Sequence, residues 1–333
     1  MRQINERFKP GRYAQAATPV KYIVVSEGYR TEPIYFSTLS EKRDVAGIGN
    51  LVELVVLQRE SLDSGLSHPS RVLDLLDEYM GCVRHGSYTL DLVLNMVSSI
   101  ICEMRGVSRR DDAISAYIEA VRASSGDCVS PDGHVTELED LLDICHDESV
   151  SRFGLEPRMD IPDLADYRPG TDSICVVVDR DRDNRDKRAM YAFLSRCSES
   201  GYRPFISNPC FELWFLMHFE EFDRLDRDVL FNNPVEDGRR FTEAELDRIL
   251  NGRWSDIHYS KESYDPFVFI HRTADAVDRG MGMCHDPTGL VSNLGTNLCD
   301  LLREICDRSM FIDVDGDGSQ SGSDPMADHR GTS

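Results

Sequence analysis

The segment Ser173–Asp183, which reads SICVVVDRDRD, constrains the fold of this chain more than any other segment. Its apolar run Ile174–Val178 has the length of a strand and is β-branched except at Cys175. A run with so little polar alternation is typical of a strand that is buried on both faces of a parallel sheet. We therefore predict an α/β fold in which helices flank a small, mostly parallel sheet.

Three acids follow this strand at alternate positions, namely Asp179, Asp181 and Asp183. Residues two apart in an extended chain point the same way and lie roughly 6.6 Å apart. Asp179 and Asp181 should therefore emerge together at the carboxyl end of the strand, where open α/β sheets place their ligands. Neighbouring carboxylates repel each other unless a cation or a proton lies between them, and oxygen-only ligation suits Mg²⁺ or Mn²⁺. A solvated acidic turn is the alternative, and the pair alone does not exclude it.

Composition limits the class of protein. The chain has 333 residues, 41% of them hydrophobic, which is enough to build a substantial core. No apolar stretch reaches the roughly 20 residues that span a bilayer, and no apolar segment of a secretory signal follows the charged N-terminus. Ten cysteines without a CxxC pair are typical of reduced thiols, rather than of a disulfide framework or a zinc site. We therefore expect a cytoplasmic protein with no membrane association.

The net charge of −22 weighs against a broad surface for polyanions. Any contact with nucleic acid should therefore be local, assisted by a metal ion, or helped by a partner.

Periodicity and composition divide the chain into five segments. These are a flexible basic arm at 1–19, the first part of the α/β domain at 20–84, a helical insertion at 85–165, the second part of that domain with a helical C-terminal region at 166–312, and a disordered acidic tail at 313–333. The tail imitates an EF-hand calcium loop, but no exit helix follows it, and we interpret it as solvated chain.

A second acidic position follows the first predicted strand. Residues 21–26 read KYIVVS and lead directly to Glu27. If this strand lies beside 174–178, Glu27 faces the aspartates, and a glutamate opposite a metal-binding aspartate pair suits phosphodiester cleavage or transfer. Arg180 and Arg182 could clamp phosphate oxygens there. Ion pairs between these arginines and the neighbouring aspartates are equally consistent with the sequence.

Three blocks of the chain together resemble the signature blocks of the RloB-like family. They read VVSEGYRTEPIYF, VVVDRDRD and ISNPCFELWFLMHF, and they begin at positions 24, 176 and 206. The stretches HYSK at 258–261 and PTGLVSNLGTNL at 287–298 are similar to the C-terminal region of the family, more loosely. The similarity covers about 20–57 and 170–305 and leaves out the helical insertion. Members of the family are Toprim-fold proteins that are encoded beside restriction systems and ABC-type ATPases in bacterial defence loci.

This resemblance implies a Toprim-like fold and a Toprim-type site. Glu27 would be the general acid or base and would also reach the metal. Asp179 and Asp181 would be the pair that binds Mg²⁺ or Mn²⁺, with Asp183 as a further ligand.

The implied function is a metal-dependent nuclease that acts on RNA or DNA, tRNA included, in antiphage defence or abortive infection with an ABC-type ATPase partner. The alternative is a non-catalytic Toprim-like binding or sensor module of the same ATPase complex. Whether the chain forms a homo-oligomer stays open.

Other residues of the blocks are candidates for the site. Glu212 lies in the first turn of an apolar helix, where an unpaired carboxylate is costly, and Lys261 could contact phosphate, so we predict catalytic roles for both. Asn208 is predicted to cap a helix that begins at Pro209, and to face the substrate. A phosphotransfer domain of the haloacid-dehalogenase type would carry its aspartates on the first strand, where this chain has Glu27.

Overall fold

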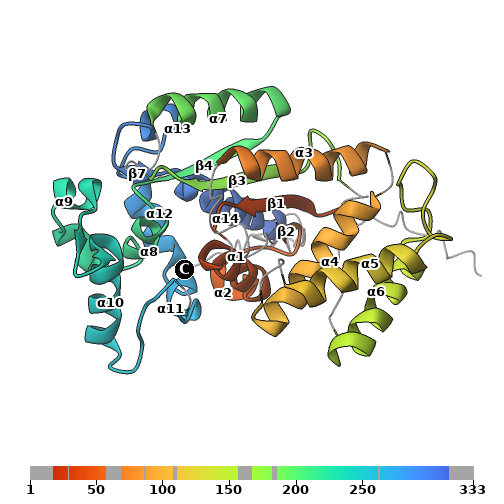
Figure 1. Ribbon diagram of the computed structural model, residues 1–333. Coiled ribbons are helices and arrows are strands. Elements are labelled where there is room, and N and C mark those ends of the chain that lie inside the picture. The colour runs from red at the N-terminus through yellow and green to blue at the C-terminus, as the bar shows by residue number, and fades with distance from the viewer. Residues whose placement is uncertain are drawn as a thin grey trace, which may run out of the picture.

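The computed structural model describes residues 18–28, 30–57, 69–85, 88–107, 111–156, 167–181, 186–261 and 263–314. Its centre is a five-stranded sheet of order β2-β1-β3-β4-β7 (Figure 1). The strands are β1 Val20–Ser26, β2 Val52–Leu57, β3 Ser173–Asp179, β4 Arg203–Asn208 and β7 Gly295–Thr296. The first four run parallel, and β7 pairs antiparallel with the end of β4. The predicted α/β class with a mostly parallel sheet is confirmed, and the arrangement is consistent with a Toprim-like fold.

Helices cover both faces of this sheet. Around the sheet they are α1 Thr31–Glu41, α2 Arg43–Ala46, α3 Pro69–His85, α7 Lys187–Ser200, α8 Glu212–Leu216, α9 Arg227–Asn232, α10 Phe241–Arg253, α11 Phe267–Ile270, α12 Thr273–Met281, α13 Pro287–Leu290 and α14 Leu298–Val314. A 3₁₀ helix spans Glu220–Arg224, and a small hairpin joins β5 Val235–Glu236 to β6 Arg239–Arg240. Among the described helices, none has both the length and the apolar character needed to cross a bilayer.

Alternate residues of the central strands enter two separate cores, as the period of two in a strand requires. Ile23, Ile174 and Val176 pack on one face against α3, α7 and α13. Tyr22 and Val177 point to the opposite face, where α1, α8, α10, α12 and α14 build the larger core. Figure 1 shows α3 and α7 above the sheet and α1 below it. The prediction that 174–178 is buried on both faces is therefore correct.

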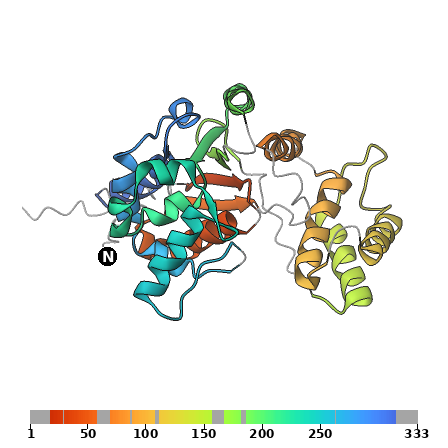
Figure 2. The same cartoon turned by 60° about the vertical axis from the view of Figure 1, so that its left-hand side comes forward.

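The predicted insertion contains three described helices with a core of their own. They are α4 Leu90–Arg105, α5 Asp112–Ser124 and α6 Leu138–Phe153. Figure 2 shows them together at one end of the molecule, beside the sheet and on the opposite side from α10. Val135 forms a β-bridge with Val129, and α6 begins three residues later. The domain boundaries stay a prediction, and the arm 1–17 and the tail 315–333 lie outside the described residues.

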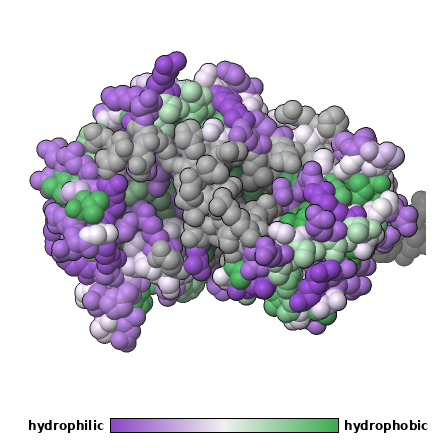
Figure 3. Space-filling view, viewed as in Figure 1, coloured by the Kyte–Doolittle hydropathy of each residue, from purple (hydrophilic) through white to green (hydrophobic). Residues whose placement is uncertain are grey.

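The coloured part of the face seen in Figure 3 is mostly hydrophilic, with hydrophobic side chains interspersed among the hydrophilic ones. The large hydrophobic residues that are exposed among the described residues are Val45, Met104, Val150, Tyr191, Val235 and Phe267, which belong to different elements. Such scattered exposure is normal for a folded surface.

Candidate functional site

The ends of β1 and β3 bring two acids together. These strands are direct neighbours, with Ser26 opposite Val177. The backbone N–H of Glu27 donates to the Val177 carbonyl at 2.8 Å, and the Glu27 carboxylate accepts from the backbone N–H of Asp179 at 3.3 Å. Glu27 is only 8% exposed. The structure therefore places Glu27 and Asp179 side by side at the carboxyl edge of the sheet, although 152 positions separate them.

Two further carboxylates face the same point. Glu32 on α1 and Glu212 on α8 are both buried. Burial, followed by repulsion from Glu32, Glu212 and Glu27, raises the pKa of Asp179 well above its usual range. Burial, followed by the charges of Glu212 and Glu27, raises the pKa of Glu32 to about 7. The four acids are therefore close enough for their negative charges to repel one another, as the raised pKa values of Asp179 and Glu32 show.

Gly28 leaves room for the Glu32 carboxylate to pack against the turn that follows β1. A Cβ atom at Gly28 would lie 1.9 Å from Glu32 Oε2, so the carboxylate folds back over the strand-to-helix turn in space that only glycine leaves.

Lys261 supplies a positive charge next to these acids. Its Nζ atom lies 3.4 Å from Glu212 Oε1 and 3.1 Å from Glu243 Oε1. The Tyr259 hydroxyl also donates to Glu212 Oε1, at 2.9 Å. Although burial opposes ionisation of Glu212, the charge of Lys261, together with hydrogen bonds from Cys210, the backbone and Tyr259, outweighs it and lowers the pKa of Glu212. The charges of Glu212 and Asp179 outweigh the partial desolvation of Lys261, which is half exposed, and raise its pKa.

Helix α1 holds the segment that carries Lys261. The Thr31 hydroxyl donates to the Lys261 carbonyl at 3.3 Å, and the Tyr264 hydroxyl donates to the Thr31 carbonyl at 2.6 Å. The segment 258–261, which resembles a family block, is thus fixed to the turn that follows Glu27.

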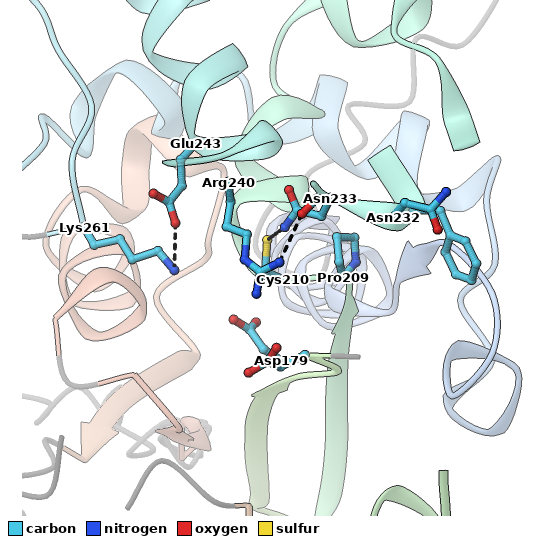
Figure 4. Close-up of a pocket in the computed structure, with 10 residues that line it drawn as sticks. Asp179, Pro209, Cys210, Asn232, Asn233, Arg240, Glu243 and Lys261 are labelled. Atoms are coloured by element: carbon cyan, nitrogen blue, oxygen red, sulfur yellow. Dashed lines mark hydrogen bonds and ion pairs between the residues drawn. The ribbon is translucent and has the colours of Figure 1, made fainter. Parts of the chain in front are cut away.

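A pocket of about 280 Å³ opens beside Asp179. Asp181, Arg240, Glu243 and Lys261 also line it. Figure 4 shows Lys261 paired with Glu243 on one side, and Arg240 extending from the β6–α10 junction toward Asp179. Arg240 Nη1 donates to the Asn233 carbonyl at 3.2 Å, which orients the guanidinium in the wall. The pocket therefore joins carboxylates at the sheet edge to two cations from the C-terminal half.

Asp181 reaches this pocket by a different route from the predicted one. Strand β3 ends at Asp179, and Asp181 has a left-handed φ of 36°. Its backbone N–H donates to the Pro209 carbonyl at 3.1 Å. The chain has left the extended conformation, so the expected alternation of side chains does not apply, yet both aspartates line one pocket.

Asn208 differs from its predicted cap role. It is the last residue of β4, the peptide bond to Pro209 is cis, and α8 begins only at Glu212. The Asn208 side chain donates to the Leu290 carbonyl at 2.7 Å and is fully buried. The prediction of an N-cap at this position is therefore wrong.

The predicted arginine clamp is only partly described. Arg180 is 3% exposed, and its Nε donates to the Val291 carbonyl at 2.9 Å. This contact ties it to the segment after α13, and its phosphate-binding role stays a prediction. Arg182 and Asp183 lie outside the described residues.

Sequence reasoning missed Tyr259, Arg240 and Glu243. Tyr259 lies inside the HYSK stretch, which could have marked it. No local pattern marks Arg240 or Glu243, because only the β5–β6 hairpin and the start of α10 bring them back to β3.

The oxygen atoms of the site fit a hard divalent cation. Glu212 Oε2 is a buried carboxylate oxygen of this site that accepts no hydrogen bond from the described residues. Oxygen-only ligand sets favour Mg²⁺ or Mn²⁺. Among the described residues, however, Glu27, Asp179 and Asp181 are not gathered within 4.8 Å of one another, so coordination requires these carboxylates to draw together.

Comparisons with known proteins give one result. A family model described as RloB-like protein matches residues 22–305, which is most of the chain. Neither the comparison with curated proteins nor the one with solved structures returned a match. The matched range contains all three sequence blocks and every acid of the site described above, and the chain belongs to the RloB-like family.

Proposed function

We propose that this chain is a metal-dependent nuclease of the Toprim type, which hydrolyses phosphodiester bonds in nucleic acid with Mg²⁺ or Mn²⁺. The observation that carries the proposal is the meeting of Glu27 and Asp179 at the carboxyl edge of the sheet, with Lys261 in the wall of the pocket that Asp179 lines. Burying acids whose pKa is raised lowers the stability of the fold, so their presence favours a role in binding or chemistry.

Glu27, Asp179 and Asp181 are the residues that would hold the cation. When bound, a divalent cation neutralises phosphate charge and lowers the pKa of a coordinated water. The hydrogen bond from the Asp179 backbone holds the Glu27 carboxylate in one orientation, from which it can accept a proton from an attacking water.

Lys261 is the group placed to contact the phosphate. Glu212 and Glu243 hold its ammonium group in position, while 48% of its side chain remains exposed. Arg240 offers a planar guanidinium that can bind a second phosphate oxygen. These two cations give the local contact with nucleic acid that a chain of net charge −22 needs.

The size of the pocket supports cleavage at an unpaired position. A volume of about 280 Å³ is at the small end for a ligand site, so it suits one nucleotide better than an intact duplex. We therefore include flexible RNA, such as the loops of tRNA, among the substrates. From the family resemblance, we also propose a role in antiphage defence with an ABC-type ATPase encoded beside this chain.

Cleavage by the purified chain tests the proposal. Labelled tRNA, single-stranded RNA and single-stranded DNA are incubated with Mg²⁺ or Mn²⁺, with and without the neighbouring ATPase. We expect metal-dependent cleavage that falls by at least about 100-fold in Asp179→Asn and Glu27→Gln. Glu199→Gln, on the exposed side of α7, is the control and should cleave normally.

Equal cleavage by wild type and Asp179→Asn would contradict the proposal. Absence of cleavage under all conditions, combined with equal phage protection by both chains, would favour a non-catalytic module of an ATPase complex.

A further inference from the structure

A second cluster of possible metal ligands lies at the antiparallel edge of the sheet. His285, Cys299 and Asp300 each offer one ligand atom, and these three atoms lie within 4.8 Å of one another. Within the part of the chain that the structure describes, no other three His, Cys, Asp or Glu side chains come this close. His285 follows the β-bridge between Cys284 and Gly295, and the other two residues lie in the first turn of α14.

The cluster is close to the geometry that a bound zinc ion needs. Zinc bonds to nitrogen, oxygen and sulfur of about 2.0–2.3 Å in a tetrahedron correspond to ligand separations of about 3.3–3.6 Å. His285 Nδ1 already lies 3.0 Å from Asp300 Oδ2. Closing the remaining separation, at most 4.8 Å, requires a movement of about 1.2–1.5 Å by one side chain.

The chemical types of the ligands select the ion. Thiolate and imidazole favour zinc and related transition metals, whereas Mg²⁺ and Ca²⁺ prefer oxygen alone. About a third of each side chain of His285 and Asp300 is exposed, so an ion can enter and a water can complete the coordination. Arg303 Nη2 lies 3.7 Å from Asp300 Oδ1, so a bound metal ion would compete with this arginine for the carboxylate.

A nucleophilic Cys-His-Asp triad does not fit the same residues. Cys299 is 0% exposed, and its thiol donates to the Thr296 carbonyl at 3.3 Å. Gly280 packs directly against it, since a Cβ there would lie 2.7 Å from Cys299 Cβ. A substrate has no room at this sulfur, whereas a single ion can approach it from the side of His285 and Asp300, whose ligand atoms lie within 4.8 Å of it.

We propose that His285, Cys299 and Asp300 form a three-ligand site for a transition-metal ion, with zinc as the ion that suits them best and a water as the fourth ligand. The ion would tie the segment 284–296 to the start of α14. That segment supports the candidate active site, because its Leu290 carbonyl accepts from Asn208 and its Val291 carbonyl accepts from Arg180. Spacing along the chain gave no sign of this site, since its cysteine has no CxxC partner.

The experiment measures bound zinc in the full-length chain. All arms carry Glu27→Gln and Asp179→Asn, so that the carboxylates at the other edge contribute no zinc binding. The protein is stripped with EDTA, incubated with ZnCl₂, desalted and analysed by mass spectrometry of the metal. We expect about one zinc per chain, and at least about tenfold less after Cys299→Ala or His285→Gln.

Cys197→Ala is the matched control, because Cys197 is also fully buried but lies on α7. It should retain zinc. Cobalt offers a second readout, namely a thiolate-to-cobalt absorption band that is lost in Cys299→Ala. If Cys299→Ala does not fold, the more exposed His285→Gln decides. Background protein without zinc, zinc that persists in His285→Gln, or equal zinc loss in Cys197→Ala would each overturn the proposal.

Discussion

Removing the charge of Lys261 should expose the electrostatic balance of the site. The perturbation is Lys261→Met, which keeps an unbranched side chain one atom shorter than lysine and leaves Glu212 buried without its cation. Coulomb's law at an effective dielectric constant of about 20 gives about 5 kcal/mol for unit charges, and the two groups are 3.4 Å apart. Because Lys261 is half exposed, solvent screening reduces this value, and we expect a net loss of about 2 kcal/mol at pH 7.5.

Urea unfolding of wild type and variant measures this loss, which corresponds to a fall in Tm of about 4 °C. The folded-state pKa of Glu212 is lowered, so the stability that it contributes is present above its unfolded pKa and is lost as the pH falls. In Lys261→Met the penalty should therefore shrink at about pH 5, because Glu212 can then take up a proton.

The double variant Glu212→Gln/Lys261→Met tests whether the unpaired charge of Glu212 causes the loss. It should recover most of the lost stability, because Glu212, the buried partner of Lys261, then carries no charge that lacks its cation. Unfolding of Lys261→Met at the same urea concentration as wild type at pH 7.5 would contradict this electrostatic pairing, as would the failure of Glu212→Gln to restore the stability of the variant.

Three further perturbations follow from contacts in the structure. Glu32→Gln should stabilise the chain by roughly 2 kcal/mol at pH 7.5 and should have no effect near pH 4. The reason is that the pKa of Glu32 is raised in the folded state, so the stability of the wild type falls as the pH rises from about 4.5 to about 7. Urea unfolding across this pH range checks the sign. Tyr259→Phe removes the 2.9 Å hydrogen bond to Glu212 and should cost about 1–3 kcal/mol in the same assay, and a variant as stable as wild type would contradict this. Gly295→Ala should prevent folding, because Gly295 has a φ of 152° and a Cβ there would lie 2.0 Å from the Cys284 carbonyl oxygen. In the control Gly252→Ala, the new Cβ meets nothing within 4 Å, and the variant should melt near the wild-type temperature by circular dichroism.

The parallel sheet was predictable because its signal is local. Five apolar residues at 174–178 can be buried on both faces only between neighbouring strands, and the structure places them there. The order of the strands in the sheet could not be predicted from such a local signal. Only the pairing of β1 with β3 brings Glu27 to Asp179, and the sequence blocks supported that pairing through resemblance to a family rather than through physics.

The errors came from positions where tertiary structure overrides a local rule. Asn208 followed by Pro209 has the pattern of a helix start, but β4 continues through Asn208 and pairs it with Gly295. Asp181 was placed by the geometry of an extended strand, although the strand ends two residues earlier. Arg240 reaches the pocket through a hairpin that is distant in sequence, and no pattern of spacing encodes that return.

Binding of Mn²⁺ to the purified chain tests most directly whether Glu27 and Asp179 form a cation site. Isothermal titration calorimetry with wild type, Glu27→Gln, Asp179→Asn and the control Glu199→Gln compares the four chains under one condition. We predict a saturable site in wild type and control, weakened at least about tenfold in either site variant. Equal Mn²⁺ affinity in wild type and in Asp179→Asn would show that the carboxylates meeting at the sheet edge hold no metal.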